Sequence, residues 1–80
     1  MKKVIIDTNK LTTMEQIHDF LAEELNFPAH YGKNLDALYD CLTDITEETE
    51  IQLTAEEETF HPLKKVLTTA AKSNKNLHIK

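Results

Sequence analysis

Hydrophobic and polar positions along the chain follow two different spacings, and the tighter one predicts short strands. Within residues 2–8, the run Val4-Ile5-Ile6 is consecutive and β-branched, which is typical of a strand buried on both faces in a parallel sheet. Residues 51–53 form a shorter stretch with polar neighbours, and apolar residues alternate with a histidine across residues 77–79. We expect a strand at each of these three places.

The wider spacing, with apolar residues three or four apart, predicts a first helix. Thr13 and Gln16 have the form of a capping box, in which the two side chains satisfy the first amide groups of a helix. The apolar stripe that follows comprises Met14, Ile17, Leu21 and Leu25, with Phe20 alongside. The helix should end before Pro28, because the residue before a proline is pushed out of the helical region.

Two further helices are predicted in the same way. Asn34 follows the only glycine, Gly32, and is a good N-cap for a second helix. The buried face of this helix comprises Leu35, Leu38, Leu42 and Ile45. Pro62 suits the first turn of a third helix, because a proline lacks the amide hydrogen that would be unpaired there anyway. The apolar face of the third helix comprises Leu63, Val66, Leu67 and Ala70.

The order of these elements is strand, helix, helix, strand, helix, strand, which predicts an α/β fold with a small, mostly parallel sheet. The chain contains no internal repeat, no low-complexity tract and no linker, so we expect residues 1–80 to form one domain. A chain of 80 residues can bury a single core, but it is too small for a deep cleft between two lobes.

Composition and charge narrow the kinds of partner. Nine basic residues against fourteen acidic ones give a formal net charge of -5, and none of the basic residues is an arginine. Nucleic-acid binding normally rests on clustered lysines and arginines, so we expect no nucleic-acid partner and favour a basic protein. The apolar runs are too short for a signal peptide or a membrane span, and Cys41 has no second cysteine to pair with. These features predict a cytoplasmic protein with no membrane partner.

The second predicted helix carries an unusual set of polar residues on one side. At about 100 degrees per residue, the face opposite the leucines contains Asp36, Tyr39, Asp40 and Thr43. Two like charges one turn apart destabilise an isolated helix by roughly 0.2 to 0.5 kcal/mol, and the helix dipole favours Asp36 but does not reach Asp40. Taken singly, an exposed acid or aromatic residue needs no functional explanation. Taken together, an aromatic ring flanked by carboxylates is better explained as a binding face for a cationic pocket.

The segment from Tyr31 to Thr43, which reads YGKNLDALYDCLT, resembles the corresponding segment of the barstar family, the small intracellular inhibitors of secreted bacterial ribonucleases. A looser likeness extends to the first strand, the first helix, and the last helix and strand, so it covers most of the chain. The resemblance implies a small three-stranded parallel sheet packed with three to four helices, which agrees with the order of elements above.

The resemblance also implies a mechanism. Inhibitors of this family insert the second helix and the loop before it into a ribonuclease active site, where their carboxylates occupy the subsites for RNA phosphates. By position, Asp40 would be the central anchor for catalytic arginines and a histidine, and Asp36 would pair with a flanking arginine or lysine. The expected partner-binding residues are His30, Tyr31, Gly32, Asn34, Asp36, Tyr39, Asp40 and Thr43.

Several residues differ from the family pattern, and these differences suggest a different partner enzyme rather than a different mechanism. His30 stands where that pattern has the first of two tyrosines, and Tyr39 and Ile45 stand where it has tryptophans. Thr69 aligns with a contacting glutamate, and residues 53–62 form a shorter segment that lacks much of one helix. We therefore expect a 1:1 complex with a basic extracellular-type ribonuclease or nuclease toxin different from the family's prototype target, and a monomer when free.

Two other functions are less well supported by the residues. One is a barstar-like module that binds a different basic protein; the other is a small enzyme, which the lack of a cleft and of a convergent catalytic set disfavours. His30 with Asp36 and Asp40 lacks the spacing of a metal site, and Cys41 is better explained as a buried residue than as a nucleophile. We expect no cofactor, no metal and no enzymatic activity.

We interpret His18, His61 and His78 as surface or cap residues, and residues 56–58 as a solvated charge run.

Overall fold

The computed structural model describes residues 1–54 and 60–80, and within them it contains one sheet and three helices. The elements in chain order are β1 (Lys2–Ile6), α1 (Met14–Glu24), α2 (Leu35–Thr43), β2 (Thr49–Leu53), α3 (His61–Ser73) and β3 (Leu77–Ile79). The strands are parallel and lie in the order β1-β2-β3. The predicted α/β fold with a three-stranded parallel sheet is therefore confirmed.

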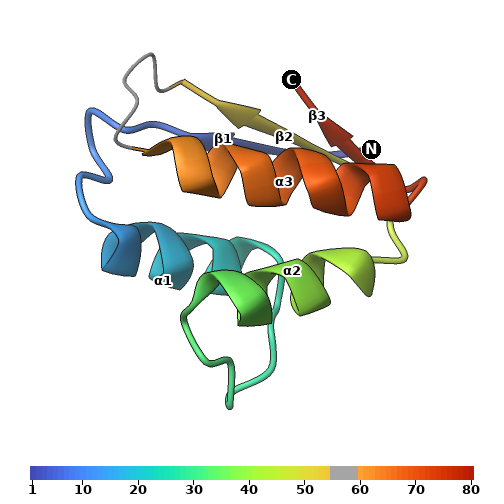
Figure 1. Ribbon diagram of the computed structural model, residues 1–80, viewed down its shortest axis with the longest axis horizontal. Helices are drawn as coiled ribbons and strands as arrows, with labels where there is room; N and C mark the ends of the chain where they lie inside the picture. Colours follow the sequence, from blue (N-terminus) through green and yellow to red (C-terminus); the bar gives the residue numbers. More distant parts are fainter. Residues whose placement is uncertain (55–59) are drawn as a thin grey trace.

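Within the part of the chain that the structure describes, helices cover only one face of the sheet, as Figure 1 shows. Val4 and Ile6 point towards the helices and are 1% and 0% exposed, whereas Ile5 between them is 49% exposed. The prediction that this strand is buried on both faces is wrong, because the described helices all lie on the same side. The open face carries polar pairs instead, such as Lys3 Nζ and Glu50 Oε2 at 3.6 Å.

α1 begins with the predicted capping box. Thr13 Oγ1 accepts a hydrogen bond from the amide of Gln16, and Gln16 Oε1 accepts one from the amide of Thr13, each at 3.2 Å. Beyond the end of the helix, Asn26 has φ 55°, in the left-handed region that turns the chain sharply towards Pro28. The predicted N-cap Thr13 is confirmed, and the helix ends at Glu24, before Pro28 as expected.

His18 is the one histidine whose predicted place is wrong. It is only 4% exposed and lies on the buried side of α1, because it stands four residues after Met14 and three before Leu21, within the apolar stripe. His61 and His78 are exposed, as predicted.

α3 packs against β3 and α2 and closes the core between the sheet and the other helices (Figure 1). Pro62 stands in its first turn, as predicted. The buried apolar core comprises Val4, Ile6, Ile17, Leu21, Leu38, Leu42, Ile51, Phe60, Leu63, Leu67, Ala70 and Leu77. Ile45 packs against this core from just beyond the end of α2 rather than from within the helix. Residues 56–58, predicted to be a solvated charge run, lie outside the described residues.

Candidate functional site

α2 places its apolar and acidic residues on opposite sides, as predicted. Leu38 and Leu42 are 0% exposed and pack in the core, whereas Asp36 and Asp40 are exposed. Within residues 1–54 and 60–80, neither carboxylate takes part in an ion pair. Their oxygens therefore remain able to accept hydrogen bonds from outside. We call Asp36, Tyr39, Asp40 and Thr43 the acidic face of α2.

The charges along α2 do not stabilise it. Asp36 lies in the first turn, where the helix dipole favours a carboxylate, but Asp40 follows one turn later and Asp44 forms the C-cap. The last turn contains no basic residue that would complement the dipole at that end. Packing and hydrogen bonds to other elements must therefore hold this helix in place.

Tyr39 and Thr43 border the aspartates and are oriented by hydrogen bonds. The Tyr39 hydroxyl lies 3.1 Å from Ser73 Oγ at the end of α3, which joins the two helices. Thr43 Oγ1 donates to the carbonyl oxygen of Asp40 at 2.9 Å. Both side chains are half-buried, so they form a fixed border beside the exposed Asp40 carboxylate.

The N-terminal end of α2 is held by its predicted cap. Asn34 Oδ1 accepts a hydrogen bond from the amide of Ala37 at 2.7 Å. A β-carbon at Gly32 would lie 3.2 Å from Asn34 Nδ2 and 3.5 Å from Ala37 Cβ, so a larger residue would crowd the cap. Asn34 and Gly32 thus shape the start of the helix, and their direct contact with a partner stays a prediction.

Residues 27–34, which we call the presenting loop, precede α2. Tyr31 turns inwards from this loop: its ring lies 4.9 Å from that of Phe27, and its hydroxyl lies 2.6 Å from His18 Nδ1. Burial raises the pKa of the Tyr31 phenol and lowers the pKa of His18, an effect that Asp19 opposes and Lys33 reinforces. The Tyr31 hydroxyl is therefore used inside the protein, whereas the His30 side chain is exposed.

Lys33 gives the presenting loop a second connection to α1. Its φ of 52° lies in the left-handed region, which costs a residue with a β-carbon about 1 to 2 kcal/mol. Lys33 Nζ lies 2.7 Å from Asp19 Oδ1, and this hydrogen bond raises the pKa of Lys33. The strained turn directly before the N-cap is thus tied to the first helix.

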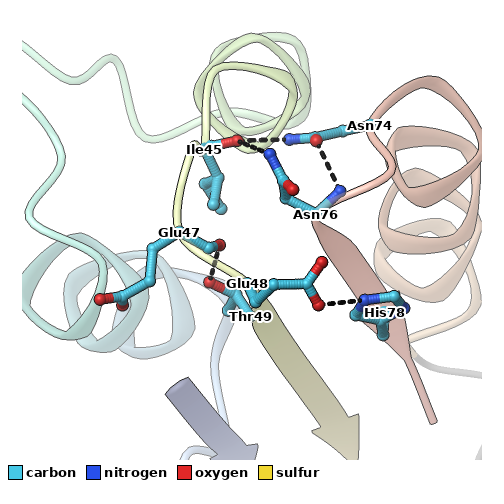
Figure 2. A network of polar contacts seen from close by, with 7 residues as sticks. All are labelled: Ile45, Glu47, Glu48, Thr49, Asn74, Asn76 and His78. Carbon is cyan, nitrogen blue, oxygen red and sulfur yellow. Dashed lines mark hydrogen bonds and ion pairs between the residues drawn. The ribbon is translucent and has the colours of Figure 1, made fainter. Parts of the chain in front are cut away.

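The C-terminal end of α2 is held by the buried side chain of Asn74. Asn74 Nδ2 donates to the carbonyl oxygens of Leu42 and Ile45, both at 2.9 Å, and Asn74 Oδ1 accepts from the amide of Asn76 at 2.9 Å. Figure 2 shows the bonds of Asn74 to Ile45 and Asn76, which join the segment after α2 to the turn before β3. A second contact in the same view joins His78 Nε2 to Glu48 Oε2 at 2.9 Å.

A hollow of about 410 Å³ adjoins the C-terminal end of α2, with Cys41, Asp44 and Ile45 in its wall. Burial raises the pKa of the Cys41 thiol, and the nearby Asp44 and Asp40 carboxylates raise it further. A thiol held in its protonated form is a poor nucleophile. Among the described residues, no group of three or more histidine, cysteine or acidic side chains is arranged to hold a metal ion, and no described helix is long and apolar enough to cross a bilayer.

The eight predicted site residues all lie on α2 or in the presenting loop, but the structure divides them by surroundings. His30, Asp36 and Asp40 have exposed side chains, whereas Tyr31 is used internally. The sequence reasoning missed His18, Lys33 and Asn74, which position the others. The position of His18 within the apolar stripe was a usable signal, whereas nothing local marks Asn74, whose partners lie 32 and 29 residues away.

Comparison with known proteins identifies the family of this chain. A family model described as Barstar (barnase inhibitor) matches residues 1–79. A protein of Bacillus subtilis (strain 168) that carries the name "Putative ribonuclease inhibitor YrdF" is 54% identical over 43 residues. This alignment covers 54% of the chain and 47% of the relative, so the match spans about half of each protein. Because the family model matches nearly the whole chain, the protein belongs to the barstar family.

Proposed function

We propose that this protein inhibits a basic ribonuclease by covering its active site with the acidic face of α2 and the presenting loop, in a 1:1 complex. Membership of the barstar family and the name of the Bacillus subtilis relative support a ribonuclease inhibitor. The observation that carries the mechanism is the pair of exposed carboxylates of Asp36 and Asp40, which have no ionic partner within the described residues.

In the proposed complex, Asp40 is the central anchor. A carboxylate accepts charge-assisted hydrogen bonds from the same arginine, lysine and protonated histidine side chains that bind the phosphates of RNA. Such a carboxylate must exchange its water for several of these bonds, because burying an unpaired charge is very costly. Asp36, one turn towards the N-terminus, then pairs with a basic side chain at the flank of the enzyme's active site.

The rigidity of α2 supports this mechanism. Its N-terminal end is capped by Asn34, its C-terminal end is bonded to Asn74, and its flank is joined to α3 through Tyr39. A face that is already ordered loses less conformational entropy on binding. The internal contacts of α2 therefore favour tight association with an enzyme surface of complementary shape.

The test is an inhibition assay. The purified protein is mixed with each of a panel of basic microbial ribonucleases, RNA cleavage is measured, and the assay is repeated with Asp40→Ala. We expect at least one enzyme of the panel to be inhibited, and we expect this inhibition to be competitive with RNA. The Asp40→Ala variant should bind about a hundredfold or more weakly, since removing one partner of a buried charge pair costs about 3 to 5 kcal/mol.

A matched control is Glu50→Gln, which removes one negative charge from the open face of the sheet, where Glu50 pairs with Lys3. This variant should inhibit almost as well as the unchanged protein. Full inhibition by Asp40→Ala would contradict the proposed anchor. Failure of the folded protein to inhibit any enzyme of the panel would contradict the proposed function and favour a different basic protein as partner.

A further inference from the structure

Two adjacent residues of α1 hold the presenting loop, although α1 itself contributes none of the predicted partner-binding residues. His18 contacts Tyr31 and Asp19 contacts Lys33. Tyr31 and Lys33 lie on either side of Gly32, and His30 directly precedes them. The conformation in which the loop presents His30 to a partner therefore depends on these two contacts.

The contact between His18 and Tyr31 is buried and short. The ring centroids are 5.7 Å apart, the Nδ1 and hydroxyl oxygen atoms are 2.6 Å apart, and His18 is only 4% exposed. The Tyr31 amide also donates to the carbonyl oxygen of Pro28 at 3.0 Å, and its ring packs on Phe27. The middle of the loop is thus folded onto α1 through one tyrosine side chain.

The contact between Asp19 and Lys33 lies nearer the surface, with both side chains about half exposed. An exposed ion pair contributes little to overall stability. Here it has a local effect, because Lys33 has the left-handed φ of 52° and is followed by the N-cap Asn34. The ion pair opposes the relaxation of this strained residue to an ordinary backbone conformation.

We propose that His18 and Asp19 are positioning residues for the proposed binding face, and that the presenting loop loosens when His18 takes up a proton. This inference rests on the proposed function in one respect, because the proposed function gives the presenting loop a role in binding. Neither residue needs to touch the partner. They act through Tyr31 and Lys33, which set the path of the backbone between His30 and the start of α2.

The surroundings of His18 disfavour the protonated ring. The neutral ring can accept the hydrogen bond from the Tyr31 hydroxyl at Nδ1, whereas the imidazolium, with two N–H donors and no acceptor, can only donate to the hydroxyl oxygen. Protonation therefore reverses this hydrogen bond and places a charge on a ring that is only 4% exposed. The charged groups that act on the ring are Asp19, which favours the proton, and Lys33, which opposes it. The adjoining hollow of about 380 Å³ is lined, besides His18, by uncharged residues of all three helices and the N-cap, namely Met14, Asn34, Leu35, Pro62 and Leu63.

The direction of the pH effect follows from burial, which lowers the pKa of His18 below its ordinary value of 6.5. A loosened loop that exposes the ring to water would take up a proton near pH 6.5, whereas the closed loop resists it. The closed arrangement is therefore fully favoured above pH 6.5 and becomes less favoured as the pH falls through the lowered pKa. Acid conditions should weaken the loop before they unfold the protein.

The first test needs no partner. Gly32 is the only glycine, so its amide gives a distinct signal in a proton–nitrogen correlation NMR spectrum. We expect this signal to change position as the pH falls below about 6.5 in the unchanged protein and to stay nearly still in His18→Asn. Asparagine can place a hydrogen-bonding atom near the position of Nδ1 but does not titrate.

The exposed His30 lies two residues before Gly32, so His30→Asn is the matched control. The pH response of Gly32 that depends on His18 should persist in that variant. The same response in His18→Asn as in the unchanged protein would overturn the inference. If His18→Asn does not fold, Tyr31→Phe removes only the hydroxyl; unchanged amide exchange of Gly32 in that variant would overturn the inference equally.

The second test uses a ribonuclease found in the inhibition assay. At about pH 7.5, Asp19→Asn and Tyr31→Phe should each bind about fivefold more weakly, in line with the loss of one hydrogen bond. Below pH 6.5, affinity should fall more for the unchanged protein than for His18→Asn. Equal pH dependence of the two proteins would contradict the positioning role of His18.

The two tests separate the two proposals. Titration of Gly32 through His18 without inhibition of any ribonuclease would contradict the proposed function and leave the loop mechanism standing. Inhibition that depends on Asp40, with Gly32 insensitive to His18, would support the proposed function and overturn the loop mechanism.

Discussion

At the scale of single residues, Asn74 determines where the C-terminal end of α2 lies. Its amide group uses both donor hydrogens on the carbonyl oxygens of Leu42 and Ile45. Its oxygen accepts a third hydrogen bond from Asn76, which Figure 2 shows together with the bond to Ile45. The side chain is 7% exposed, so water replaces these bonds poorly. A residue outside the acidic face thereby fixes the helix that carries it.

We predict that Asn74→Ala lowers the free energy of unfolding by about 1 to 3 kcal/mol, because it leaves buried carbonyl oxygens unpaired. Unfolding in urea, followed by far-ultraviolet circular dichroism, measures the change. The control is Asn76→Ala, which removes only a long contact of 3.5 Å to Ile45 and should cost less than about 1 kcal/mol. Equal losses in the two variants would contradict the assignment.

At the scale of elements, α2 carries like charges that its fold does not require. Asp36, Asp40 and Asp44 follow each other at intervals of four residues, and each neighbouring pair is unfavourable by roughly 0.2 to 0.5 kcal/mol. Only Asp36 gains from the dipole at the N-terminal end of the helix. The middle carboxylate therefore reduces stability, which is the pattern expected where a residue serves binding.

We predict that Asp40→Asn raises the free energy of unfolding by roughly 0.2 to 1 kcal/mol, since it relieves repulsion from both neighbours. Asp36→Asn should give no such gain, because the favourable interaction with the helix dipole is lost at the same time. Urea unfolding at low ionic strength compares the two variants. A loss of stability in Asp40→Asn would show that Asp40 has a structural role that the present account lacks.

The elements themselves were largely predictable from the sequence, because their signals are local. The capping box at Thr13, the N-cap Asn34 and the proline in the first turn of α3 all act within one helical turn. The open face of the sheet was not predicted from the run Val4-Ile5-Ile6, since consecutive apolar residues do not say how many helices cover a sheet. The alternation of polar and apolar residues in β2 indicates more directly that one face of the sheet is buried and the other is exposed.

The site was predictable only in part, for a similar reason. Helical periodicity separates Asp36 and Asp40 from the leucines, and the structure confirms that separation. The inward turn of Tyr31 depends on His18, thirteen residues earlier, and the place of the C-terminal end of α2 depends on Asn74. Contacts between residues distant in sequence leave no local pattern, so sequence reasoning alone could not assign these supporting roles.

At the scale of the whole molecule, the charge distribution favours rapid association with a basic partner. The net charge is -5, and the exposed aspartates of α2 lie on a face without compensating ion pairs among the described residues. Attraction between opposite charges steers diffusing proteins towards each other and is screened by salt.

We predict that the association rate constant with an inhibited ribonuclease falls about tenfold or more when the salt concentration rises from low to high, while the dissociation rate constant changes much less. Stopped-flow mixing at several ionic strengths measures both constants. Glu50→Gln should lower the association rate slightly through net charge, whereas Asp36→Asn should lower it more because its charge lies in the binding face. An association rate independent of salt would contradict electrostatic steering.

The central claim is that the Asp40 carboxylate anchors this protein in a ribonuclease active site. The most direct test is the dissociation constant of the complex for Asp40→Asn, measured beside Glu50→Gln under identical conditions. Asp40→Asn keeps the size of the side chain and removes only its charge, so folding stability should not fall. We predict at least about a hundredfold weaker binding for Asp40→Asn and nearly unchanged binding for Glu50→Gln. Similar dissociation constants for the two variants would contradict the role of Asp40 as the anchor.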